Sequence, residues 1–465
     1  MTDLLVRGGT VVTAAGSFPA DVAVDGELIS AIEPDLGRLA EGVGETLDAT
    51  GLLVLPGCID VHTHTRLPTD AEPDRFFTDS VAAAFGGTTT FLTFNTPATG
   101  ATLVGDRSLT ADAAAWRSAT EGEAAVDFGL SLVVTGRHSD PIAEVPAIIE
   151  RGIPTAKAFM VYDFRLPDER LYGVMRELGR HGGMLQVHCE DPVLIDTAVA
   201  TALQRGNTLP RYHASTRSRE AEAVATHRAM AFARQAEAPV YVVHLSSAAA
   251  LDEVARAKAT GVRAHAETCP HYLALTADLY DLPDAEAVRY VISPPLRPAT
   301  DRAALWDGLA DGRLDAIATD HVPDRLDREK AEAARGVPFD RISNGAPGIE
   351  TLLAVAWTEG VAARRITAER LVDLLATTPA RLFGLGRKGA VEVGRDADLV
   401  LFDPAARRTM HAADLHHTSD YTPYEGREVA GRVRSVFVRG RAVIRDDAFV
   451  GRRGGGRFVE RRLAR

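Results

Sequence analysis

The chain has 465 residues, 46% of them hydrophobic, and a formal net charge of −12 at pH 7. This acidic balance argues against nucleic acid or an anionic membrane surface as the main partner. No apolar run reaches the roughly 18 residues of a membrane-spanning helix. The first residues also lack a basic segment followed by an apolar one, so we expect neither a membrane span nor a secretory signal.

The chain contains three cysteines, Cys58, Cys189 and Cys269, which lie far apart and form no Cys-x-x-Cys pair. This spacing predicts neither a disulfide framework nor a cysteine zinc site. Small buried thiols of this kind are typical of a reducing compartment. We therefore expect a cytoplasmic protein.

Both ends of the chain are predicted to be rich in β-strands. Residues 1–56 and 390–445 show short segments of alternating polar and apolar residues, separated by glycines. We expect the two ends to form one small β-sandwich, with domains at residues 1–56, 57–389 and 390–465. The tail at residues 451–465 is rich in Arg and Gly. We expect it to be mobile or to pack on a neighbouring subunit.

The central region alternates short apolar runs with alanine-rich helical stretches, such as residues 75–86, 168–182 and 219–235. The eight apolar runs are residues 57–64, 88–94, 127–134, 152–161, 183–188, 238–244, 261–267 and 313–320. Eight strands separated by helices predict an α/β fold of the (β/α)8 barrel type.

Polar side chains stand within or at the ends of these runs. Barrel enzymes carry their active sites at the C-terminal ends of the strands. The side chains that could bind a metal ion there are His62, His64, Lys157, His188, His244 and Asp320. Any one of the histidines could be a core residue bonded to a backbone carbonyl, but the six together predict a metal site.

Lys157 is the most informative of the six, because only four of the 52 basic residues are lysines. Arginine would serve equally well in a structural ion pair. A neutral lysine amine can also react with CO₂ to form a carbamate, an anionic ligand able to bridge two cations roughly 3.5–4 Å apart. Spacing alone leaves this interpretation and an ordinary buried Lys–Asp or Lys–Glu pair equally open.

A two-metal site would suit hydrolysis of an unactivated C–N bond, because a bound metal lowers the pKa of water from about 15.7 to about 7. Asp320 could accept the proton of that water and pass it to a leaving amine. Tyr162, which follows Lys157 closely, could polarise a carbonyl and stabilise the oxyanion.

Ten segments together resemble the cyclic amidohydrolases of the hydantoinase/dihydropyrimidinase family, within the amidohydrolase superfamily. They are PGCIDVHTH, DRFFTDSVAAAFGGTTT, AKAFMVY, LQVHCED, YVVHLSS, AETCPHYL, ISPPLR, IATDHVP, NGAPGIETLL and DYTPYEGREVAG. The similarity covers nearly the whole chain. It implies a TIM-like barrel with a β-sandwich built from both ends. It also implies a homotetramer or dimer, often with the C-terminal segment at an interface.

The resemblance also implies two divalent metal ions, usually zinc, bridged by Lys157 in its carboxylated form, N6-carboxylysine. One ion would be held by His62, His64, Lys157 and Asp320, and the other by Lys157, His188 and His244.

The implied substrate is a small cyclic amide. Tyr162 would act on its carbonyl, and Ser293 and Asn344 would hold the ring amide through their backbone groups. The loops after His64 and Lys157 would shape the pocket for the exocyclic substituent of the ring.

Arg66 departs from this pattern, since hydantoinases commonly have a small, neutral or acidic residue there. The segment HTRLP, which contains Arg66, and the pair Asn95-Thr96 match dihydroorotases, in which the Arg and Asn bind the substrate carboxylate. Asp324 argues against that family, because it stands where a second histidine is expected. Arg66 is therefore expected either to recognise an anionic or polar substituent or to pair with an acid at residues 69–74.

Three functions follow from these observations. The first is metal-dependent hydrolysis of a 5-substituted hydantoin or a dihydropyrimidine. The second is allantoinase or dihydroorotase-like hydrolysis of a polar or carboxylate-bearing cyclic ureide. The third is a non-catalytic assembly scaffold, against which the six intact metal-binding positions argue. An unrelated barrel hydrolase would share the metal chemistry but would not be expected to carry NGAPGIE.

Overall fold

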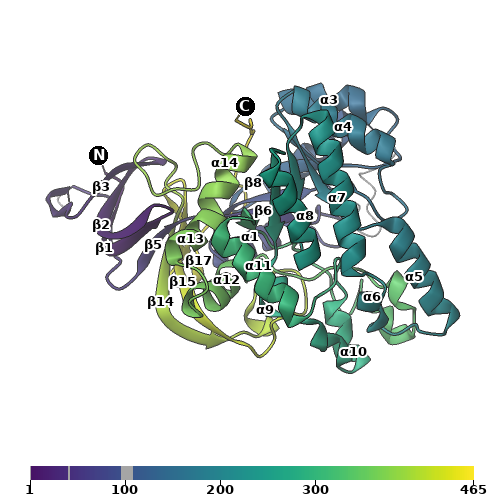
Figure 1. The fold of residues 1–465 in the computed structure, drawn as a ribbon. Helices are drawn as coiled ribbons and strands as arrows, with labels where there is room; N and C mark the ends of the chain where they lie inside the picture. The colour runs from purple at the N-terminus through teal and green to yellow at the C-terminus, as the bar shows by residue number, and fades with distance from the viewer. Residues whose placement is uncertain (1, 40–41, 96–107, 465) are drawn as a thin grey trace.

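The computed structural model describes residues 2–39, 42–95 and 108–464. Within these residues the chain forms two units that lie side by side (Figure 1). One is a barrel of parallel strands surrounded by helices. The other is a β-sheet made from the two ends of the chain.

The described chain contains eight parallel barrel strands, which pair with one another in chain order. They are β6 (Cys58–Thr63), β7 (Thr88–Phe94), β8 (Asp127–Val134), β9 (Thr155–Phe159), β10 (Met184–His188), β11 (Val240–Val242), β12 (Ala264–Thr268) and β13 (Ala316–Ile317). Each lies within or overlaps one of the predicted apolar runs, so the (β/α)8 prediction is confirmed. Nearly all their residues are buried, which explains why continuous apolar runs rather than alternating patterns mark them.

The barrel closes between its first and last strands. Thr63 forms a parallel bridge with His321, and the N–H of His64 donates to the His321 carbonyl at 2.7 Å. The buried carboxylate of Asp60 accepts from the N–H of Thr319 at 3.0 Å and from its hydroxyl at 2.5 Å. Closure therefore brings the residues that follow β6 next to those that follow β13.

Helices cover the outside of the barrel. The longer ones are α1 (Arg75–Phe85), α2 (Leu109–Thr120), α3 (Pro141–Glu150), α4 (Asp168–Arg180), α5 (Pro192–Gln204), α7 (Arg219–Ala236), α8 (Ala248–Ala259) and α11 (Ala299–Asp311). The shorter ones are α6 (Tyr212–Ser215), α9 (Pro270–Ala274), α10 (Asp284–Ala287), α12 (Leu352–Ala356), α13 (Ala368–Val372) and α14 (Thr378–Phe383). Ser108, Ser218 and Ser247 cap α2, α7 and α8 by accepting from backbone N–H groups. None of the helices among the described residues is long and apolar enough to cross a membrane.

The two ends of the chain form one mixed sheet, which has nine strands in the described residues. Its strands are β1 (Leu4–Thr13), β2 (Gly16–Asp25), β3 (Leu28–Glu33), β4 (Glu45–Asp48), β5 (Leu53–Pro56), β14 (Leu399–Thr409), β15 (Glu428–Val438), β16 (Arg441–Arg445) and β17 (Ala448–Phe449). The antiparallel pair of β5 and β14 joins the N-terminal strands to the C-terminal ones. The prediction that both ends build one β-unit is confirmed. The exact domain limits at residues 1–56, 57–389 and 390–465 stay a prediction.

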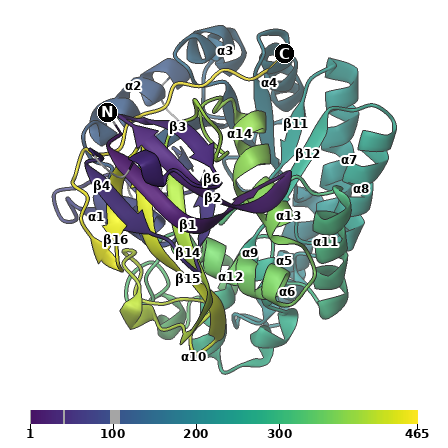
Figure 2. The ribbon, with the colours of Figure 1, turned by 90° about the vertical axis from the view of Figure 1, so that its left-hand side faces the viewer.

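The C-terminal tail packs on the barrel of its own chain, which differs from the expectation of a mobile segment; its contact with a neighbouring subunit stays a prediction. Phe128 exchanges backbone hydrogen bonds with Arg457 and Val459. The buried guanidinium of Arg461 donates to the carbonyl of Leu130 at 2.5 Å. Figure 2 shows the tail crossing the molecule toward α4. Several of its partners are backbone groups, which leave no mark in the sequence.

A buried ion network joins the barrel to the β-unit. The Nζ of Lys388 lies 2.8 Å from Asp127 at the start of β8 and 2.7 Å from Asp398 just before β14. All three side chains are buried. Burial alone would lower the pKa of Lys388, but the two carboxylates raise it above the ordinary lysine value. The charged lysine thus stabilises the contact between the two units.

Replacing Lys388 with Met should destabilise the protein strongly, because the buried carboxylate of Asp398 loses its cation and Asp127 keeps only Arg439. Removing one partner of a buried ion pair costs about 3–5 kcal/mol, so we expect a loss of that order in the free energy of unfolding in urea. The control is Arg117→Met, which removes an exposed pair with Glu460 and should change the free energy by less than about 1 kcal/mol. Equal effects of the two substitutions would contradict a stabilising role for Lys388.

Candidate active site

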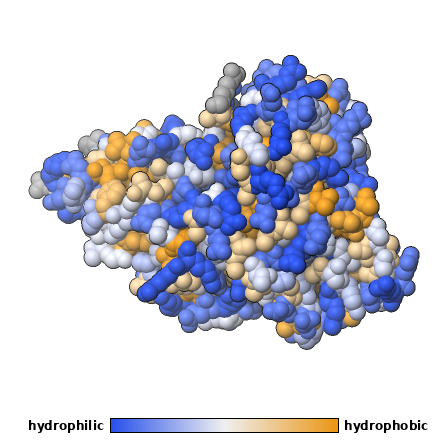
Figure 3. All heavy atoms as spheres, in the orientation of Figure 1, coloured by the Kyte–Doolittle hydropathy of each residue, from blue (hydrophilic) through white to orange (hydrophobic). Residues whose placement is uncertain are grey.

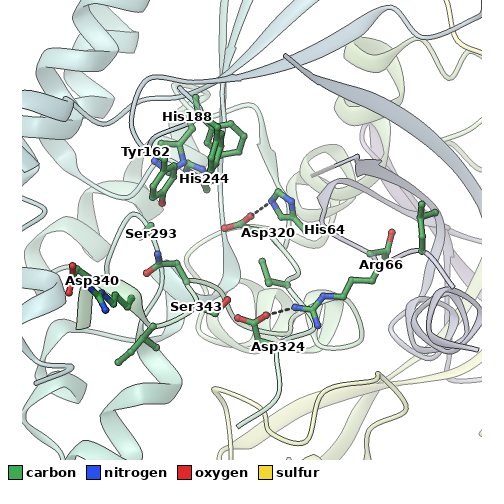
Figure 4. Close-up of a pocket in the computed structure, with 18 of the residues that line it drawn as sticks. His64, Arg66, Tyr162, His188, His244, Ser293, Asp320, Asp324, Asp340 and Ser343 are labelled. Carbon is green, nitrogen blue, oxygen red and sulfur yellow. Dashed lines mark hydrogen bonds and ion pairs between the residues drawn. The ribbon is translucent and has the colours of Figure 1, made fainter. Parts of the chain in front are cut away.

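The six predicted metal-binding side chains meet at the C-terminal ends of the barrel strands. Three of them lie on strands β6, β9 and β10, and three lie one to three residues after the ends of β6, β11 and β13. In that order they are His62, Lys157, His188, His64, His244 and Asp320. Figure 4 shows His188 and His244 beside Tyr162, with His64 and Asp320 nearby.

Asp320 connects the histidines of this cluster. Its Oδ1 is 2.9 Å from His62 Nε2 and 3.0 Å from His64 Nε2, and the two ring nitrogens are 3.3 Å apart. Ligand atoms of His62, His244 and Asp320 all lie within 4.8 Å of one another, so these three side chains could hold one ion. The ring centroid of His188 is 4.5 Å from that of His244, which places a fourth imidazole at the same centre.

Lys157 is fully buried beside this cluster, and its Nζ has no hydrogen-bond partner among the described residues. The rings of Phe94 and Phe159 flank the amine, with centroids at 4.7 Å and 5.0 Å. Burial lowers the pKa of Lys157 to about 8, which makes the neutral amine accessible near neutral pH. The ordinary Lys–Asp or Lys–Glu pair that the sequence left open is not found in the described part of the chain.

The surroundings of His64, His188, His244 and Asp320 favour the protonation states in which these side chains bind metals. Burial lowers the pKa of His64 to about 4 and also lowers those of His188 and His244, so these imidazoles are neutral at pH 7. Burial would raise the pKa of Asp320, but His62 and hydrogen bonds from the imidazoles hold it well below its ordinary value. Neutral imidazole and ionised carboxylate are the states that coordinate metal ions.

Two carboxylates that the sequence analysis did not assign support the histidines. Glu267 on β12 accepts from His62 Nδ1 and, at 2.9 Å, from the hydroxyl of Tyr241. Glu190 lies 2.7 Å from His188 Nε2. Carboxylates in this position fix the orientation of ligating imidazoles. Their only signal in the sequence was their place in the segments AETCPHYL and LQVHCED.

The backbone turns sharply at three positions of the site. Tyr162, His244 and Asp320 have positive φ values of 77°, 39° and 50°. Side-chain-bearing residues rarely adopt this conformation, which costs about 1–3 kcal/mol each. Each follows a barrel strand closely, so the unfavourable backbone directs side chains from separate strands toward one centre.

A cavity of about 340 Å³ opens next to this centre. Its size suits a small organic molecule. Its walls include His64, His188, His244 and Asp320 together with the predicted substrate-binding residues Tyr162, Ser293 and Asn344. The structure therefore brings the expected metal ligands and the expected ring-binding residues into one place.

Arg66 also lines the cavity, but its guanidinium is already paired (Figure 4). It donates to the carboxylates of Asp324 and Glu329, which approach from the connection after β13. Its acidic partners are therefore not those expected at residues 69–74. Two carboxylates balance the charge of Arg66 before any substrate enters.

Asn95 does not belong to the cavity wall that the described residues form. It is fully buried at the end of β7, and its side-chain oxygen accepts from the N–H of Val133 at 2.6 Å. Thr96, the other half of the expected pair, lies outside the described residues. The position of Asn95 indicates that it holds neighbouring strands together.

The barrel, the buried histidine and carboxylate cluster and the adjoining cavity define a barrel protein of the metal-dependent hydrolase class. The pattern of the amidohydrolase family matches residues 53–443. The chain belongs to the amidohydrolase family. This family implies a divalent metal site, and the donor set described above fits one.

Individual relatives match over almost their full length. A D-hydantoinase from Streptomyces coelicolor is 38% identical, and the match covers 98% of this chain and 97% of the relative. A D-hydantoinase from Geobacillus stearothermophilus is 39% identical, and the match covers 98% of this chain and 96% of the relative. The crystal structure of a dihydropyrimidinase from Brevibacillus agri is 40% identical, covers 100% of both chains and superimposes with a TM-score of 0.93.

Glu267→Gln should weaken the retention of divalent metal about 10–100-fold, because a neutral amide orients His62 less firmly than a carboxylate does. Competition between the protein and a zinc chelator measures this affinity. Tyr241→Phe is the control, since it removes a different hydrogen bond to Glu267 and leaves the contact with His62. Unchanged metal affinity in the Gln variant would show that Glu267 does not support the metal-binding histidine.

Proposed function

We propose that this protein hydrolyses the cyclic amide C–N bond of a 5-substituted hydantoin or a dihydropyrimidine. The observation that carries the proposal is the buried, unpaired Lys157 amine beside four imidazoles and Asp320. His64, His188, His244 and Asp320 of this cluster line the adjoining cavity. The similarity to D-hydantoinases and to a dihydropyrimidinase over nearly the whole chain supports the same substrate class.

We propose that two divalent ions, zinc in our assignment, occupy the centre. His62, His64, Lys157 and Asp320 would hold one, and Lys157, His188 and His244 the other. Bound divalent ions supply the Lewis acidity that lowers the pKa of water and polarises a carbonyl. Lys157 would serve as N6-carboxylysine: its neutral amine forms an N–C bond with CO₂ and releases one proton, which gives an anionic ligand with two oxygens.

The residues around the cavity would divide the remaining chemistry. Asp320, which is ionised because its pKa is held low, would accept a proton from the attacking water and deliver it to the ring nitrogen as the C–N bond breaks. The hydroxyl of Tyr162 would donate to the carbonyl oxygen as negative charge develops there. The backbone groups of Ser293 and Asn344, which line the same cavity, would hold the ring amide.

The paired state of Arg66 supports a ring with a neutral substituent. A substrate carboxylate would compete with Asp324 and Glu329 for the guanidinium. The alternative of an allantoinase or dihydroorotase-like enzyme, in which Arg66 and Asn95 bind the substrate, is therefore not favoured. Asn95 is engaged with Val133 and lies outside the wall formed by described residues.

We also propose a cytoplasmic homo-oligomer, a dimer or a tetramer, that acts on small molecules and not on nucleic acid or membranes. The acidic net charge of −12 supports the first exclusion. The face in Figure 3 is mostly hydrophilic, with hydrophobic areas between. At the start of α5, Val193 is 71% and Leu194 44% exposed, which supports contact with another subunit.

The proposal is tested by initial hydrolysis rates of the zinc-loaded, bicarbonate-supplied protein on five rings. These are dihydrouracil, a neutral 5-aryl hydantoin, carboxymethyl hydantoin, dihydroorotate and allantoin. We expect hydrolysis of dihydrouracil and of the 5-aryl hydantoin. A preference for allantoin or a carboxylate-bearing ring would favour the alternative, and no hydrolysis of any ring by metal-loaded protein would contradict the proposed class.

A further inference from the structure

A second buried lysine, Lys330, lies outside the metal centre in the long connection between β13 and α12. It is 1% exposed and is one of only four lysines in the chain. Its Nζ donates to the carbonyl of Val291 at 3.1 Å and to the carbonyl of Ser343 at 2.9 Å. In the described ranges no carboxylate comes within ion-pair distance of this amine, so two neutral carbonyls are its hydrogen-bond partners.

These carbonyls belong to the two segments that carry the proposed ring-binding residues. Val291 stands two positions before Ser293, and Ser343 stands directly before Asn344. Ser293, Ser343 and Asn344 all line the cavity. Lys330 therefore ties together two stretches of backbone that reach the cavity from different parts of the chain.

The backbone at this junction is restrained from other sides as well. The N–H of Gly345 donates to the same Val291 carbonyl at 3.0 Å. Gly345 has a φ of 149°, and a Cβ at this position would lie 2.5 Å from Val322 Cβ, so only glycine fits. On the far side, His213 Nε2 is 2.8 Å from the carbonyl of Ile292.

Burial of Lys330 is unfavourable for stability, which indicates a functional reason for its presence. Burial lowers its pKa to about 8, although Asp324 and Glu329 act in the opposite direction. A buried cation satisfied only by neutral groups destabilises a fold. Lysine suits the position sterically, because its compact ammonium group reaches two carbonyls where a planar guanidinium needs more room.

We propose that Lys330 is a positioning residue for substrate binding: it fixes the separation of the backbone at Ser293 and Asn344 to which the ring amide binds. The identity of that ring rests on the proposed function. The amine of Lys330 forms no hydrogen bond with the segments that carry the proposed metal ligands. Its loss should therefore raise KM for the ring while leaving the metal content unchanged.

The test is Lys330→Met, which keeps the length of the side chain and removes its donors, in full-length, zinc-loaded protein assayed with the best neutral ring. We expect KM to rise about tenfold, because a displaced backbone segment would bind the ring amide less well. The value of kcat should change less than about threefold. Lys330→Gln, which keeps an N–H donor, should recover part of the affinity. Zinc content should equal that of the wild type in both variants.

Lys258→Met is the matched control. Lys258 also donates to a carbonyl, that of Arg313 at 2.9 Å, and to Asp315 at 2.7 Å, but it lines no part of the cavity that the described residues form. It should leave KM unchanged. A folded Met variant of Lys330 with wild-type KM, or an equal rise in KM in the Lys258 variant, would overturn the proposal.

The Gln variant decides the question if the Met variant does not fold: a raised KM supports the positioning role, and a wild-type KM overturns it. Failure of the proposed function is recognised separately. In that case the wild-type protein itself hydrolyses no ring, and the ring-binding role of Lys330 falls with it. Failure of the Lys330 role alone leaves wild-type hydrolysis intact and shows only in the comparison of variants.

Discussion

Burying the amine of Lys157 without a partner is the constraint on which the arrangement of the site depends. Water would solvate an ammonium group far better than the aromatic rings that flank it here. The described residues offer the amine no carboxylate and no carbonyl within hydrogen-bond distance. Burial lowers the pKa of this amine and so favours its neutral form, which is the form that reacts with CO₂. The carbamate would then serve as a ligand of the metal centre.

The other barrel strands place the proposed metal-binding side chains around that amine. Closure of β6 against the segment after β13 sets His64 beside Asp320, and Glu267 directs the ring of His62 toward the same centre. Positive φ values at Tyr162 and Asp320 turn the chain where each strand ends. The interactions that stabilise the fold thus hold together a group of polar side chains whose burial is unfavourable by itself.

The sequence predicted the features that repeat along the chain. Barrel strands are buried on both faces, so each left an apolar run, and the position of His188 or Asp320 at the end of its run predicted a shared location. Pairings between distant positions could not be predicted in this way. Arg66 pairs with Asp324 and Glu329, which lie 258 and 263 positions later in the chain, and Arg461 and Lys330 bind carbonyl groups, which every residue carries. Only the scarcity of lysine hinted that Lys330 was unusual.

We infer that Lys157 carries a CO₂ adduct, which would serve as an anionic ligand of the metal centre. The most direct measurement is the ¹³C NMR spectrum of the zinc-loaded protein prepared with ¹³C-labelled bicarbonate. We expect a carbamate resonance in the wild-type protein that is absent from Lys157→Met. A spectrum without that resonance, from protein that binds two zinc ions and hydrolyses its ring, would contradict the account.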